Sequence, residues 1–118
     1  MQNESLDALL KRILSAVVSE VAHSVYTGKE KTYIVFNYNT VPFHFSDDEP
    51  EFDKYLIQVH LFTPIAGNIN STIKSIKTVL RAAGFTYPES FDLSDDNGKH
   101  IVFETENVDM LDEVTDNV

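Results

Sequence analysis

The sequence predicts an α+β fold, in which a mainly antiparallel sheet carries two amphipathic helices, a C-terminal β-hairpin and an acidic tail. Three observations predict it: two segments with apolar residues at helical spacing, two strand-like runs between them, and an Asn-Gly turn near the end. The short connections favour antiparallel pairing over βαβ crossovers. A chain of 118 residues has the length of one domain. We place this domain at residues 1–107, followed by an acidic segment, residues 108–118, that forms at most a short helix or an arm ordering on contact.

The first helix is predicted over residues 6–21, because eight apolar side chains recur there at the i, i+3, i+4, i+7 spacing of one helix face. Asn3 or Ser5 is able to cap its start. Residues 22–26 form either a short strand or the exit of this helix, and residues 27–30 form a turn. The apolar face consists of Leu6, Leu9, Leu10, Ile13, Leu14, Val17, Val18 and Val21.

Two strands are predicted before the second helix. Residues 33–38 are rich in β-branched and aromatic side chains on both faces, which is typical of a central strand. Residues 52–63 alternate between two faces and are ended by Pro64. Between the strands, residues 39–51 contain two prolines and an acidic run, which predicts a loop. In the second strand one face holds Tyr55, Ile57, Val59 and Leu61, and the other holds Leu56, Gln58, His60 and Phe62.

The second helix is predicted over residues 69–83, with Lys74, Lys77 and Arg81 on its outer side. Asn68 is suited to its N-cap and Gly84 to the position just after its end. Residues 85–93 and 99–105 then flank Asn97-Gly98, a strong signal for a β-hairpin because both turn positions tolerate positive φ.

The negative charge is concentrated in the last third of the chain. Of the net charge of −10, residues 1–83 contribute little, with nine acidic and eight basic residues, whereas residues 84–118 hold ten acidic residues and only Lys99. Such a surface repels phosphate backbones, so specific nucleic-acid binding is disfavoured. There is no cysteine, which excludes disulfides, thiolate zinc sites and thiol nucleophiles. The start has no basic signal region or long apolar run, so we expect an intracellular protein with no membrane segment and no secretion.

No residue pattern indicates catalysis, and we expect no enzyme, metal site or cofactor. None of the four histidines has a second one three or four residues away, as a helical zinc site requires, and His60 is interpreted as a hydrogen-bonded residue of a sheet face. Residues 92–98 superficially resemble a calcium loop, but the glycine stands at the seventh position and the twelfth is Phe103, so a hairpin turn is preferred. The chain also lacks a glycine-rich phosphate loop and a Gly-x-Ser-x-Gly motif. The histidines are His23, His44, His60 and His100.

The segment between the two strands is the candidate protein interface. Its phenylalanines either fold back on the core or are displayed to a partner, because connecting segments usually run over the surface. In the second case they would act as aromatic anchors of an interface rimmed by acidic residues. The candidate interface residues are Val41, Phe43, His44, Phe45, Asp47, Asp48 and Glu49.

Several segments together carry a resemblance to a known family: residues 6–21, the strand 33–36, the run Asp-Lys-Tyr-Leu-Ile-Gln-Val-His-Leu-Phe at 53–62, Arg-Ala-Ala-Gly-Phe at 81–85, and 98–103. In their order and residue pattern they resemble the tail-completion proteins of long-tailed bacteriophages and prophages. These include tail terminators and tail-to-head joining proteins.

The resemblance implies a structural protein that forms a ring, commonly hexameric, at the end of the tail tube. Its expected partners are further copies of itself, the tail tube protein and the head-completion or connector protein. DNA would pass through the ring without specific binding, and the protein would reside in the bacterial host cytoplasm during assembly and then in the virion. The alternative is a bacterial protein-binding or regulatory module, either dimeric or an acidic inhibitor. No catalytic residues come with the family.

Overall fold

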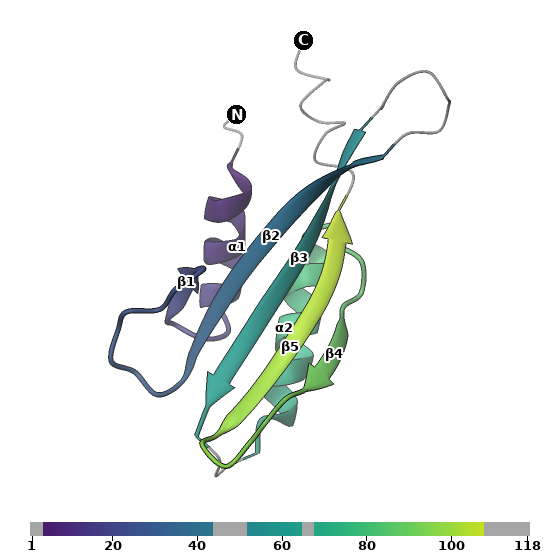
Figure 1. Ribbon diagram of the computed structural model, residues 1–118. Helices are drawn as coiled ribbons and strands as arrows, with labels where there is room; N and C mark the ends of the chain where they lie inside the picture. The colour runs from purple at the N-terminus through teal and green to yellow at the C-terminus, as the bar shows by residue number, and fades with distance from the viewer. Residues whose placement is uncertain (1–3, 44–51, 65–67, 108–118) are drawn as a thin grey trace.

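The computed structural model describes residues 4–43, 52–64 and 68–107, and it has two helices and a five-stranded sheet (Figure 1). The predicted α+β class is therefore confirmed. In chain order the elements are α1 (Leu6–Ser15), β1 (Val21–His23), β2 (Tyr33–Phe43), β3 (Phe52–Thr63), α2 (Asn70–Ala82), β4 (Glu89–Asp92) and β5 (Lys99–Asn107).

The sheet is mixed, with the strand order β1-β2-β3-β5-β4. Its β2–β3, β3–β5 and β5–β4 pairs are antiparallel, whereas the three-residue strand β1 pairs in parallel with β2. The C-terminal hairpin is present as β4 and β5. At its turn the Asp95 N–H donates to the Gly98 carbonyl at 3.0 Å, and the Gly98 N–H donates to the Asp95 carbonyl at 3.2 Å.

Helix α1 is shorter than predicted. Ser5 caps it, its Oγ accepting a hydrogen bond from the Ala8 N–H at 3.1 Å, but the helix ends at Ser15 rather than at Val21. The chain turns there because residues 21–23 pair with β2, an interaction anchored by the Ile34 N–H donating to the Glu20 carbonyl at 2.8 Å. The sequence left residues 22–26 as either a short strand or the exit of the helix. The structure has a strand, β1, which starts at Val21, one residue before the predicted segment.

Helix α2 runs close to its predicted bounds. Asn68 precedes the N-cap position, which is Ile69, and its Oδ1 accepts from the Asn70 N–H at 2.9 Å. The predicted cap is thus off by one residue. Gly84 follows the helix with φ of 104°, a conformation that favours glycine, as predicted.

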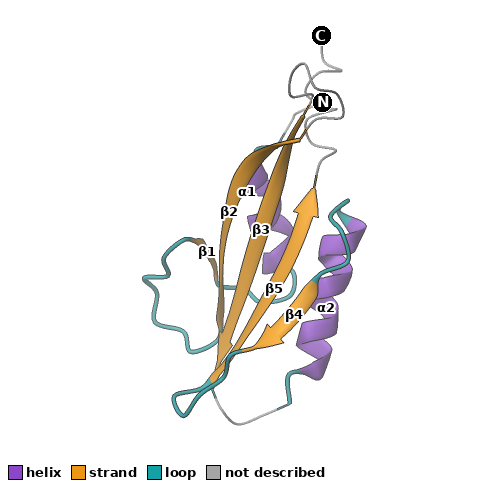
Figure 2. Ribbon diagram, turned by 45° about the vertical axis from the view of Figure 1, so that its right-hand side comes forward, coloured by secondary structure: helices purple, strands orange, loops and turns teal. Residues whose placement is uncertain are grey.

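Both helices pack on the same face of the sheet, as Figures 1 and 2 show. Their buried apolar side chains meet those of β2, β3 and β5 in one core, and alternation along β3 turns Ile57, Val59 and Leu61 toward the helices. The core comprises Leu6, Leu10, Leu14, Val18, Ile34, Phe36, Ile57, Val59, Leu61, Ile76, Leu80, Phe85, Ile101 and Phe103.

The predicted loop at residues 39–51 is wrong in its first part, because β2 continues through Pro42 to Phe43. This stretch of β2 pairs only with β3, since β1, its other neighbour, pairs no further than Phe36. On the far side of β3, β5 ends opposite Tyr55. A proline is tolerated there because a strand with one neighbour leaves alternate N–H groups without a ladder partner. Residues 41–43 and 52–54 therefore form a two-stranded ribbon that projects beyond the rest of the sheet (Figure 1).

A candidate protein-binding face of the sheet

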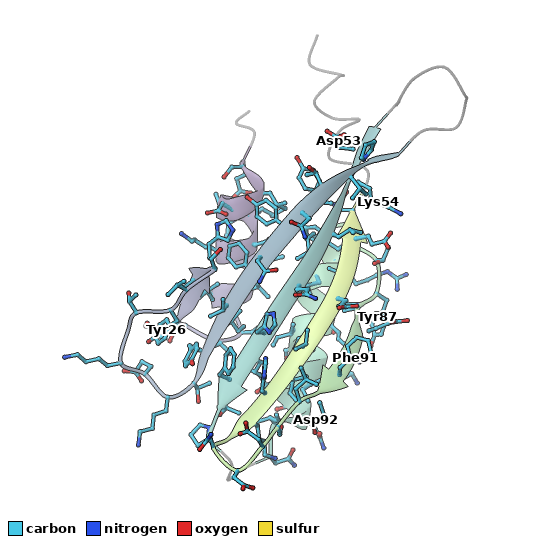
Figure 3. The ribbon with its side chains drawn as sticks, viewed as in Figure 1. Tyr26, Asp53, Lys54, Tyr87, Phe91 and Asp92 are labelled. Atoms are coloured by element: carbon cyan, nitrogen blue, oxygen red, sulfur yellow. The ribbon has the colours of Figure 1, made fainter. Side chains whose placement is uncertain are left out.

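The second face of the sheet carries neither helix, and it faces the viewer in Figure 3. We call it the open face. Because directly paired residues point to the same side of a sheet, the strand register assigns its side chains to rows. The rows are Tyr33, Phe62 and His100; then Val35, His60, Val102 and Phe91; then Asn37, Gln58, Glu104 and Glu89; then Asn39, Leu56 and Glu106; and last Val41 with Lys54.

The first two rows and Tyr26 make up the aromatic half of the open face. Tyr26 stacks on Tyr33 with ring centroids 4.2 Å apart, and Tyr33 stacks on Phe62 at 5.0 Å. Phe62 in turn stacks on His100 at 4.2 Å, and His100 lies 5.2 Å from His60. Five rings from three strands and the β1–β2 connection thus form one continuous array.

The aromatic array buries apolar side chains without help from a helix. Val35 and Val102 belong to the open face, yet they are only 9% and 5% exposed. Each valine is paired directly with His60 across the sheet, so both lie in the row next to Tyr33, Phe62 and His100. The array is therefore a packed surface of fixed shape, and rings held in this way lose little conformational entropy when a partner covers them.

Within the array His60 and His100 form a hydrogen bond, with Nδ1 of His60 2.9 Å from Nε2 of His100. One ring nitrogen donates and the other accepts, so the bond requires at least one neutral imidazole. Burial lowers the pKa of His60, and the nearby charge of His100 lowers it further. The interpretation of His60 as a hydrogen-bonded residue of a sheet face agrees with this geometry, and its partner is His100.

The third and fourth rows make up the acidic half of the open face. Gln58 Nε2 donates to Glu104 Oε2 at 3.0 Å, and Lys54 Nζ lies 3.5 Å from Glu106 Oε1. Glu89 stands directly opposite Glu104 in the β4–β5 ladder. Two like charges in such a pair repel one another, so this part of the face gains stability from an added positive charge.

Exposed large apolar side chains gather around the open face. Leu56 and Phe91 belong to its rows, at 37% and 44% exposure, and Val25 lines a shallow hollow of about 450 Å³ together with Tyr26 and His60. A second hollow, of about 620 Å³, is lined by Tyr33, Phe62 and His100 beside the β5 hairpin turn. Contiguous exposed apolar surface of this kind marks sites of protein–protein contact more often than isolated residues do.

The structure describes only part of the interface predicted from the sequence. Val41 is half-buried and lies opposite Lys54 at the base of the projecting ribbon, and Phe43 closes the ribbon opposite Phe52. His44, Phe45, Asp47, Asp48 and Glu49 lie outside the described residues. The sequence analysis missed the open face as a site, although aromatic residues on both faces of 33–38 and the run from His60 to Phe62 were signals for it.

Among the residues described, no three His, Asp or Glu side chains are grouped so that they could hold a metal ion. In the same part of the chain, neither helix has the length and apolar character needed to cross a membrane.

Comparisons with known proteins bear on the fold alone. No protein-family model matches the sequence, and no match is found among curated proteins. Among solved structures, one chain whose name carries no description of function matches 90% of this chain and 96% of its own length, with a TM-score of 0.51 and 13% sequence identity. The arrangement of helices and strands is thus shared with a solved protein of similar size.

Proposed function

We propose that this protein is a structural assembly protein that caps the phage tail tube, joins the tail to the head, or does both, acting as a homo-oligomeric ring. The observation that carries the proposal is the open face: a packed aromatic array beside a polar, acidic half, with both helices on the other side of the sheet. An apolar centre with a polar rim is the usual anatomy of a protein–protein interface.

The projecting ribbon supports the same function. Residues 41–43 and 52–54 extend beyond the end of β5, so the backbone of this ribbon projects past the rest of the sheet (Figure 1). Such a ribbon reaches a neighbouring subunit or a tube end more readily than a residue in the body of the sheet does. Val41 and Phe43, two of the candidate interface residues from the sequence, belong to this ribbon.

The proposed partners are further copies of the chain, the tail tube protein and the head-completion protein. The host cytoplasm and then the virion are the proposed locations. The acidic last third of the chain fits a ring through which DNA passes, because carboxylates do not bind phosphates.

The test is to incubate the purified protein with tail tubes that lack their own completion protein and to image the tube ends. We expect density at one end of each tube, and loss of that density for Phe62→Ser, which removes the central ring of the array. Ser19→Ala, an exposed change between α1 and β1, is the matched control. Tubes that stay bare with native partners supplied would exclude a tail-completion role.

The acidic half of the open face favours a second candidate, an acidic inhibitor that mimics nucleic acid. Glu89, Glu104 and Glu106 present carboxylates in adjacent rows of a rigid sheet. The location of the coding sequence separates the two: flanking capsid and tail genes favour assembly, and flanking regulatory genes favour inhibition.

A further inference from the structure

We propose that copies of this chain associate head to tail, with the basic side of α2 on one copy docking on the acidic half of the open face of the next. This inference rests on the proposed ring function and names the surfaces that would make the ring. The partner is a second copy of the chain, chosen because the charges of the two surfaces are complementary.

The basic surface is provided by α2. The helix contains Lys74, Lys77 and Arg81 and no acidic residue. Residues at i, i+3 and i+7 lie on one side of a helix, so the three cations form a stripe. Lys77 Nζ lies 5.6 Å from the centre of the Tyr87 ring, and within the described residues no carboxylate forms an ion pair with Lys74 or Arg81.

The acidic surface has an excess of negative charge, since within the part of the chain that the structure describes neither Glu89 nor Glu104 forms an ion pair. Lys54 pairs with Glu106, but Glu104 receives only the neutral amide of Gln58 and stands opposite Glu89. A cation placed between Glu89 and Glu104 would convert a repulsive cross-strand pair into an attractive group of three charges. The stripe on α2 supplies such cations. The exposed Leu56, next to Glu106 on the acidic half, adds an apolar contact.

The two surfaces are distinct, since α2 lies behind the sheet and beside β4 while the acidic half lies on the open face (Figure 2). Two copies stacked with the acidic halves of their open faces together would instead bring Glu89, Glu104 and Glu106 of one against the same residues of the other. That arrangement is repulsive. A contact between two different surfaces leaves one surface of each kind free on every pair, so further copies add, and a ring closes where the rotation between neighbouring copies allows it.

The absence of native cysteine allows a direct test by thiol cross-linking. A chain carrying both Lys74→Cys and Glu104→Cys is treated with a short bis-maleimide, and we expect a ladder of products beyond the dimer. Each single-cysteine variant should stay largely uncross-linked. The matched control pairs Ser15→Cys, exposed at the end of α1, with Glu104→Cys, and it should give no ladder. A ladder that stops at the dimer, or cross-linking of Glu104→Cys to itself, would overturn the head-to-tail contact.

Charge reversal provides a second readout that does not depend on cross-linker geometry. One variant carries Lys74→Glu, Lys77→Glu and Arg81→Glu; the other carries Glu89→Lys, Glu104→Lys and Glu106→Lys. Each alone should remain monomeric by sedimentation, because like charges then face one another. A 1:1 mixture should associate, because each reversed surface meets its complement. Circular dichroism confirms that both variants fold, and a mixture that stays monomeric would count against the contact.

The inference and the proposed function fail differently. If the ladder forms but tubes remain bare, the contact between copies stands and the tail role is lost. If tubes are capped but no cross-linked ladder appears and the mixture of charge-reversed variants stays monomeric, the tail role stands and the contact between copies lies elsewhere.

Discussion

The half-buried His60 imidazole belongs to the aromatic array, and its hydrogen bond to His100 depends on a neutral ring. Burial, and next the charge of His100, lower its pKa below the ordinary value of 6.5. The folded state therefore binds a proton at this site less readily than the unfolded chain does. The contribution of His60 to stability is complete above its unfolded pKa and is lost as the pH falls through its folded pKa.

We predict that the free energy of unfolding decreases as the pH is lowered from about 8 to about 5, and that His60→Phe reduces this decrease. Phenylalanine keeps a ring in the array but cannot take up a proton. Denaturant unfolding followed by circular dichroism measures the effect, and NMR titration of the imidazole gives the pKa itself. With His100→Phe as the control, burial alone should still keep the pKa of His60 below 6.5. A folded pKa at or above that value would contradict the prediction.

The positive φ of Gly84 is the conformation with which the chain leaves α2. Its φ of 104° is strained for any residue with a Cβ, while the space around it is open, the nearest atom to an added Cβ being Nδ2 of Asn107 at 3.9 Å. We predict that Gly84→Ala destabilises the fold by about 1–2 kcal/mol through strain alone. Gly84→Asn should cost less, because asparagine tolerates positive φ better than alanine. Chemical denaturation of both variants measures the difference, and equal losses would point to a steric cause instead.

At the scale of elements, neighbouring positions of β3 serve different purposes. Leu61 is 1% exposed and packs into the core, whereas Phe62 lies on the open face between Tyr33 and His100. We predict that Leu61→Ala lowers the free energy of unfolding by about 2–5 kcal/mol. Phe62→Ala should lower it by roughly 1–3 kcal/mol, because it loses close stacking on Tyr33 and His100, worth about 0.5–1.5 kcal/mol each, besides a more distant contact with the His60 ring.

Association should rank these two variants in the opposite order. Under conditions where both are folded, Leu61→Ala should self-associate like the unchanged chain, and Phe62→Ala should associate less. Sedimentation velocity at matched fractions of folded protein makes the comparison. Equal association of the two variants would mean that the aromatic half takes no part in the contact.

Elements whose signals are local could be predicted from the sequence. Alternation placed β3 at its observed bounds, Asn97-Gly98 placed the hairpin turn, and Gly84 marked the end of α2. Each depends on a periodicity or on the φ preference of one residue, so no distant partner needs to be known.

Elements decided by distant partners could not be predicted in the same way. Residues 16–21 keep the apolar spacing of a helix, but pairing of β1 with β2 takes the chain out of it, and Val18 reaches the core from a turn instead. Pro42 suggested a loop, because its place beside a single neighbouring strand depends on where β1 ends. Local propensity is overridden in both places by tertiary pairing.

At the scale of the whole molecule, the open face follows from the strand order. His60 and His100 are 40 residues apart, and they meet only because β5 inserts between β3 and β4. The same insertion sets Glu104 opposite Glu89 and beside Gln58. The sequence showed an excess of carboxylates in the last third, but the pairing of strands decides which of them share a surface.

The strongest consequence at this scale is a salt dependence of self-association. Raising the NaCl concentration from about 50 mM to about 500 mM shortens the range of charge interactions, so it should weaken the docking of the α2 stripe on Glu89 and Glu104. The variant with Lys74→Gln and Arg81→Gln should associate more weakly at low salt and change little as salt is added, because it retains only the apolar contacts and Lys77. Phe62→Ser should associate more weakly at every salt concentration, but its association should fall with added salt as steeply as that of the unchanged chain.

Sedimentation velocity over a series of NaCl concentrations measures this salt dependence for the unchanged chain and for both variants. Association that is constant or rises with salt in the unchanged chain would show that the contact is apolar throughout, and the acidic half would then have to face something other than α2.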